Sequence, residues 1–274
     1  MLRIIFSHLI AIMALIVSPA HAQEQQTVNS LAWVQGPSTQ AVGDHATIQV
    51  PAGAMFLDTT STQDLLRLTE NTPDPGAVTL AAKDLSWFAI LKYESTGHVA
   101  DNEAIDGDAL FKSMKDNETA ANEEKVRLGF GKLFLDGWSV TPHYDGQTRN
   151  LEWGLKLHDE RGNQMINYTT RTLGREGLVA STLVTSPEAF DGDLARFREA
   201  MAGLNFNAGQ TYAEFREGDK TAEYGLAALI AGGAAAAAVK SGAGKGLIKL
   251  IFVGIAAAFA AVVGFFKKLF GGSK

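Results

Sequence analysis

The sequence has no cysteine among its 274 residues. Disulfide scaffolds, zinc ribbons and thiol catalysis are therefore excluded. The sequence also lacks the G-x-S-x-G, H-E-x-x-H, Walker and G-x-G-x-x-G patterns that mark hydrolases, metalloproteases and nucleotide-binding proteins. From the sequence we expect no cofactor and no metal site.

Positive charge is scarce in the middle of the chain. The first 22 residues carry one charged residue, Arg3, and residues 224–274 carry six lysines and no acid, which leaves 17 basic and 30 acidic residues in 23–223. The resulting net charge of −13 over these 201 residues repels phosphates and excludes nucleic acid as a partner. A body of this size buries about 70% of its unfolded surface, which is enough for one core.

Residues 1–22 are typical of a secretory signal peptide. Arg3 supplies the positive start, residues 9–17 form an uncharged apolar run, and Ala20-His21-Ala22 is an A-x-A cleavage site. The apolar run is short for a membrane span, which disfavours the alternative of an uncleaved anchor. The body of the chain is thus expected outside the cytoplasm.

Residues 226–270 are predicted to anchor the chain in a membrane, with 214–225 as a juxtamembrane connector and 271–274 as a tail. Residues 226–239 and 250–266 carry no charge. If both runs insert they form a hairpin, and if only the second inserts it is a single span. The small residues Ala256, Ala260 and Gly264 recur every fourth position and narrowly favour two segments.

A basic amphipathic helix lying on the membrane is a third reading of this end of the chain. Its lysines stand at the ends of the segment rather than along one face, which disfavours it. The residues expected at the membrane interface are Tyr224, Lys240, Lys245, Lys249, Lys267 and Lys268.

Residues 23–213 are predicted to form one α+β domain. One helix is expected to open at a capping box that starts at Ser61, and a second to run from Asp106 or Asp108 to about Leu128. A third helix is expected to begin at Pro187, with Ser186 as its N-cap. Short connections favour antiparallel pairing, and hence a twisted antiparallel sheet covered by helices. The order resembles the sandwich of the Mog1/PsbP-like group, which is an analogy of fold alone. The strands are expected at residues 46–50, 87–93, 137–144, 150–158, 165–173 and 178–184.

Polar side chains gather on the predicted strands. Three of them are candidates for general acid–base chemistry: His143, Asp145 and His158. Four more are candidates for ligand contacts: Trp138, Tyr144, Glu152 and Arg171. The alternative is a half-solvated sheet face with cross-strand ion pairs.

An acidic cluster precedes the second predicted helix. Asp101, Glu103, Asp106 and Asp108 surround Gly107, but their spacing does not fit an EF-hand loop. Acids are favoured near a helix N-terminus, and we expect that role for them.

Several segments resemble one family, the bacterial membrane-anchored proteins built on domain of unknown function 2167. The resemblance spans nearly all of the mature chain and implies a signal peptide, an extracytoplasmic domain and a C-terminal anchor, but no activity. One departure is Val140-Thr141, where a second proline before Pro142 is expected. The matching segments are residues 33–37, Gly137-Trp138 with 142–145, 151–153, 167–171 with 173–177, and 215–220 with 222–226.

Taken together, the sequence predicts a protein of the bacterial inner membrane with its main domain in the periplasm. Besides the lipid bilayer, its expected partner is another envelope protein, or a second copy bound through the anchor. The first function hypothesis is a non-enzymatic binding or assembly module. The alternatives are an envelope hydrolase or ligand-binding enzyme that uses the His/Asp patch, and a membrane-active oligomeric tail.

Overall fold

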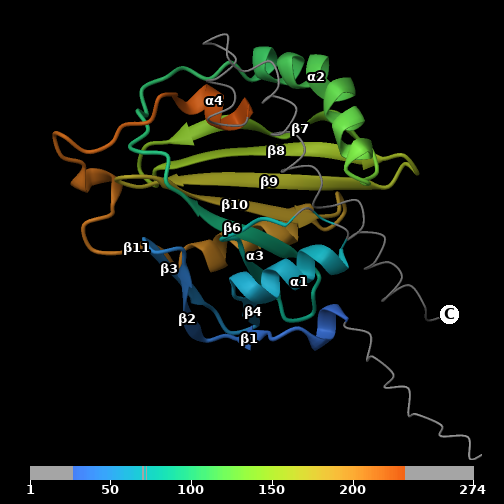
Figure 1. Cartoon of the computed structure of the whole chain (residues 1–274), viewed down its shortest axis with the longest axis horizontal. Helices are drawn as coiled ribbons and strands as arrows, with labels where there is room; N and C mark the ends of the chain where they lie inside the picture. The colour runs from blue at the N-terminus through green and yellow to red at the C-terminus, as the bar shows by residue number, and fades with distance from the viewer. Residues whose placement is uncertain (1–26, 70, 72, 232–274) are drawn as a thin grey trace, which may run out of the picture.

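The computed structural model describes residues 27–69, 71 and 73–231 (Figure 1). The predicted signal peptide lies outside the described residues, as does the predicted anchor beyond Ala231 with its five interface lysines. Among the residues that are described, none of the helices is both long and apolar enough to cross a membrane.

An eight-stranded antiparallel sheet forms the middle layer, and a three-stranded sheet lies beside it. The large antiparallel sheet and its covering helices confirm the mixed fold predicted from the sequence. In spatial order the large sheet comprises β1 (Val34–Gln35), β4 (Ala54–Leu57), β5 (Val78–Ala82), β6 (Phe88–Glu94), β10 (Leu178–Thr185), β9 (Gln164–Leu173), β8 (Asn150–Asp159) and β7 (Leu133–Asp145). The small sheet comprises β11 (Leu204–Phe206), β3 (Ala46–Val50) and β2 (Ser38–Val42).

Two hydrophobic clusters lie on opposite faces of the large sheet. One includes Leu65 of α1 (Thr59–Leu68), Met114 of α2 (Gly107–Arg127) and Leu229 of α4 (Leu226–Ala231). The other includes Phe197 of α3 (Phe190–Met201) and Ile48 of the small sheet. Figure 1 accordingly places α1, α2 and α4 on one side of the sheet and α3 on the other. Two 3-10 turns complete the elements: η1 (Val28–Ser30) and η2 (Tyr212–Glu214).

Strand β8 follows the alternation that its sequence predicts. Leu151, Trp153, Leu155 and Leu157 are all buried, whereas Lys156 between them is exposed. Because successive side chains of a strand point to opposite faces, this pattern fixes the register of β8 against the core.

Two of the three predicted helix starts need correction. Helix α1 begins at Thr59, because the carboxylate of Asp58 accepts the Ser61 N–H at 2.8 Å and so makes Asp58 the N-cap, three residues before the predicted cap Ser61. Helix α3 begins at Phe190 rather than at Pro187, since residues 187–189 form turns first. Helix α2 has Asp106 as its N-cap, and Asp106 is one of the two residues at which the sequence predicts this helix to start.

Helix α2 docks against the outer edge of the sheet through side chains that satisfy backbone groups. Asn122 donates to the Leu133 carbonyl at 2.8 Å and accepts the Leu133 N–H at 3.0 Å. Lys115 donates to the Leu135 carbonyl at 2.8 Å. The helix thus covers the start of edge strand β7, where unpaired backbone groups invite pairing with other chains.

Candidate functional site

The structure brings His143 and Glu152 together and places His158 elsewhere. His143 and Glu152 are partners across β7 and β8, with Nε2 3.7 Å from Oε2. His158 lies near the other end of β8, with its Nδ1 2.8 Å from Asp136 Oδ1. His158 follows Glu152 by six positions along the extended strand, a separation of about 20 Å. The three predicted acid–base candidates therefore do not share one patch.

Asp145 closes the turn between β7 and β8. Its carboxylate accepts the Gln147 N–H at 2.8 Å and the Thr148 hydroxyl at 2.9 Å. These hydrogen bonds lower the pKa of Asp145 below its usual range. Side chains of Asp commonly stabilise turns in this way, and the contacts account for the residue without a catalytic role.

The four predicted ligand-contact residues divide between the two faces of the sheet. Glu152 points toward α3, whose Arg198 donates to it at 3.2 Å, and it also accepts the Tyr168 hydroxyl. The other three lie on the face that α2 and α4 cover: Trp138, Tyr144 and Arg171. Arg171 pairs with Leu151 of β8, the neighbour of Glu152. Because neighbouring positions of a strand face opposite ways, Glu152 and Arg171 lie on different faces of the sheet.

Residues 207–231, named here the C-terminal arm, are held against one end of the sheet. Arg175, in the β9–β10 turn, donates through Nε and Nη2 to the two carboxylate oxygens of Asp219, each at 2.7 Å. Arg175 also donates to the Gly209 carbonyl at 3.1 Å. Bidentate pairs of this kind fix geometry as well as contribute energy. The hydrogen bonds from Arg175 lower the pKa of Asp219 to about 2.

His98 joins the same arm from the loop that follows β6. Its ring stacks between Tyr212 and Phe215, with centroids 4.3 and 4.0 Å away. Its backbone forms a bridge to the arm. The His98 N–H donates to the Lys220 carbonyl, and the His98 carbonyl accepts the Ala222 N–H, both at 2.8 Å. The arm therefore has aromatic, ionic and backbone contacts to two separate loops.

Asp101 anchors a polar network beside these rings. It accepts the Tyr144 hydroxyl at 2.9 Å and Arg149 Nη1 at 2.7 Å, and Arg149 lies over the Tyr212 ring at 4.9 Å. Burial by itself raises the pKa of Asp101. Other effects, among them the hydrogen bond from Tyr144 and the charge of Arg149, outweigh burial, so the pKa of Asp101 is lowered. Arg149 adopts a left-handed backbone with φ of 59°, an uncommon conformation outside glycine.

The acidic cluster before α2 is used for structure. Asp101 belongs to the network above, and Asp106 caps α2. Glu103 accepts the Ala227 N–H at 3.0 Å and so holds the start of α4. A Cβ at Gly225 would lie 2.3 Å from Glu103 Oε2, so a side chain there would require this carboxylate to move.

The folded unit extends past the boundary predicted at residue 213. Leu226, Leu229 and Ile230 of α4 are buried in the core shared with α1 and α2, with exposures of 0, 1 and 3%. Tyr224 is half-buried against the same core, near Glu94 and Arg171, and burial raises its pKa. Residues 214–225 are thus packed against the domain up to the start of α4.

These features define an α+β domain whose C-terminal arm is built into one end of the sheet. The chain belongs to the family described as Protein of unknown function (DUF2167), whose pattern matches residues 34–266. Among curated proteins, none matches the chain.

Solved structures that are similar to this chain include two proteins. Cyanobacterial PsbP (CyanoP) from Synechocystis sp. PCC 6803 is 12% identical, with 69% of this chain and 100% of that chain covered and a TM-score of 0.35. The Saccharomyces cerevisiae Ran-binding protein Mog1p is 10% identical, with 63% and 96% covered and a TM-score of 0.33. Similarities at this level carry no argument about function.

Proposed function

We propose that this protein is a non-enzymatic binding or assembly module of the bacterial cell envelope, anchored in the inner membrane with its domain in the periplasm. In this proposal the C-terminal arm holds the domain in one orientation relative to the anchor. The observation that supports it is the packing of residues 207–231 against the sheet through Arg175–Asp219, the His98 stack and buried α4.

A packed arm matters for a binding module because a flexible linker lets a tethered domain sample many orientations. A fixed arm presents one surface to a membrane neighbour and lowers the entropy lost on binding. The net charge of −13 on residues 23–223 supports the need for an anchor, since an anionic membrane repels an acidic domain.

Anchoring is tested with two forms of the chain expressed in a Gram-negative host. The full chain is compared with a chain that ends at Ala231, which keeps every contact of the arm described above. We expect the full chain in the membrane fraction after alkaline washing and the shortened chain in the periplasmic extract. Recovery of both forms in the periplasmic extract contradicts the anchor. A periplasm-only reporter fused after Lys274 then separates the hairpin from the single span.

Binding is tested by crosslinking in living cells followed by identification of the attached proteins. We expect the same envelope protein in independent experiments, and its loss when Arg175 and Asp219 are replaced together by Met and Asn. The proposal is contradicted if no protein is recovered reproducibly and the purified chain instead converts a small molecule.

A further inference from the structure

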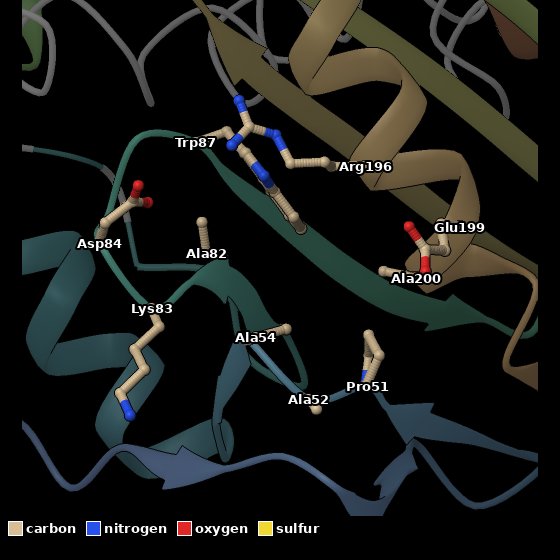
Figure 2. A pocket seen from close by; sticks show the side chains of 11 residues that line it. Pro51, Ala52, Ala54, Ala82, Lys83, Asp84, Trp87, Arg196, Glu199 and Ala200 are labelled. Carbon is tan, nitrogen blue, oxygen red and sulfur yellow. The ribbon is translucent and has the colours of Figure 1, made fainter.

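A cleft of about 440 Å³ lies far from the C-terminal arm, at the opposite end of strand β6 (Figure 2). Its walls are the turn at residues 51–54, the loop between β5 and β6, and the last turns of α3. Among the lining residues, Ala54, Ala82 and Ala200 are small and apolar. The volume is within the range of small-molecule sites, which combine an apolar lining with a few polar groups.

Trp87 lines this cleft with an unused hydrogen-bond donor. The side chain is 3% exposed and packs edge-on against Phe197, with ring centroids 6.3 Å apart. Its indole Nε1 finds no acceptor within the described part of the chain. Buried N–H groups nearly always have a partner, and an unpaired one costs free energy that a ligand can recover.

Two charged side chains of α3 stand along the same cleft without pairing to each other. Arg196, whose side chain is 54% exposed, donates from Nη2 to Asp193 at 2.9 Å and keeps other donors of its guanidinium available. Glu199 has no hydrogen bond or ion pair to any residue in 27–69, 71 or 73–231. Figure 2 shows Arg196 beside Trp87 at one end of the cleft and Glu199 on the α3 side next to Ala200.

The loop opposite α3 adds a fixed acid. Asp84 accepts the Ser86 N–H at 3.0 Å, and the hydrogen bonds from Ser86 lower the pKa of Asp84. The next residue, Leu85, is held in a left-handed conformation with φ of 56° although it is not glycine. With Lys83 also on the wall, the cleft is lined by two cationic side chains, Lys83 and Arg196, and by two anionic ones, Asp84 and Glu199. A ligand with charge of one sign therefore meets repulsion as well as attraction.

We propose that this cleft binds a small amino-carboxylate. The ligand carboxylate pairs with the Arg196 guanidinium. The exposed Arg196 side chain shifts when the ligand binds, and the same carboxylate then accepts the Trp87 indole N–H. The ligand ammonium pairs with Glu199. A simple anion leaves Glu199 without a partner, and a simple cation leaves the indole N–H unpaired. This proposal is independent of the anchor and of any envelope partner.

The test uses fluorine-19 NMR of the full chain in detergent, labelled with 5-fluorotryptophan at its four tryptophans. The Trp87→Phe variant assigns the Trp87 resonance, and if that variant fails to fold, Phe variants of the other three assign it by elimination. The probes are glycylglycine, N-acetylglycine, which lacks the ammonium, and glycinamide, which lacks the carboxylate. We expect glycylglycine to shift the Trp87 resonance saturably, N-acetylglycine to do so more weakly, and glycinamide to leave it unchanged.

Variants of the two exposed charges separate the contacts. We expect Arg196→Met to weaken glycylglycine binding at least about tenfold, because a charge-assisted hydrogen bond is lost. We expect Glu199→Gln to weaken glycylglycine but leave N-acetylglycine unchanged. The control is Asp191→Asn, which removes an exposed charge from the first turn of the same helix. The proposal is overturned if no probe shifts Trp87, if all four resonances shift alike, or if Arg196→Met binds as tightly as the unmodified chain.

Discussion

Arg175 and Asp219 meet across 44 residues of sequence in a bidentate ion pair, both contacts at 2.7 Å. Their side chains are only 14 and 10% exposed, so solvent screens the pair less than a surface pair. Arg175 belongs to the turn between two central strands, and Asp219 belongs to the C-terminal arm. The pair therefore ties the end of the described chain directly to the middle of the sheet.

Removing this tie is expected to loosen the arm and leave the sheet intact. In Asp219→Asn the charge of Arg175 loses its partner, so we expect amide hydrogen exchange in residues 207–225 to accelerate by at least about tenfold, with β8 and β9 unchanged. Hydrogen exchange with mass spectrometry measures both regions in one experiment. The matched control is Arg216→Met, which removes a charge from the same arm and keeps the backbone N–H that Asp219 accepts. Equal exchange in the unmodified chain and Asp219→Asn contradicts the role of the pair.

A glycine in the facing loop is expected to be needed for the arm to dock. Gly97 has φ of +88°, and a Cβ there would lie 2.7 Å from the Thr221 carbonyl carbon. Gly162 has φ of +80° with nothing within 4 Å of such a Cβ. Both Ala variants pay about 1 kcal/mol for the left-handed backbone, and Gly97→Ala loses roughly 1–3 kcal/mol more through overlap with the arm. Urea unfolding measures the difference, and equal losses in the two variants refute the close contact.

Lys125 gives the domain a predictable dependence on pH. Its side chain is 1% exposed, and burial lowers its pKa from 10.5 to about 7. Between these two values the unfolded chain binds the proton that the folded chain has lost, so this residue makes the free energy of unfolding rise with pH from about 7 to 10.5. Below that window both states are protonated, and the full cost of the buried charge is present.

The Lys125→Met variant is expected to lose that rise and to be more stable than the unmodified chain at about pH 6, by on the order of 3 kcal/mol. Urea unfolding of the full chain in detergent across this pH range is the measurement. Lys112→Met on the exposed side of the same helix serves as control, since its pairing with Asp116 is exposed to solvent. The same pH slope in Lys125→Met and the unmodified chain would rule out the buried charge.

Much of the fold could be predicted because its local signals are strong. The alternation of β8 and the apolar stripe of Phe190, Leu194 and Phe197 each specify a buried face by themselves. The starts of α1 and α3 could not be placed, because Asp58 competes with Ser61 as cap, and because the turns after Ser186 delay the helix.

The candidate site was less predictable, because it depends on contacts between distant segments. The sequence placed His143 and His158 on neighbouring predicted strands, but the register pairs His143 with Glu152 and so puts the two histidines near opposite ends of the β7–β8 pair. Arg175 and Asp219 carried no local signal of pairing, although each lies in a segment that resembles the family. The indole of Trp87 had none either, since an unpaired buried donor exists only in the folded arrangement.

The most direct test of the account is whether the C-terminal arm is rigid in the full chain. Because the chain has no cysteine, spin labels at Lys156→Cys in β8 and Glu217→Cys in the arm are unique, and both positions are exposed. Pulsed electron spin resonance then measures their separation in detergent and in reconstituted lipid bilayers. We predict one narrow distance distribution that is the same in both media and that Asp219→Asn broadens. A broad distribution in the chain that retains Asp219 would contradict the account.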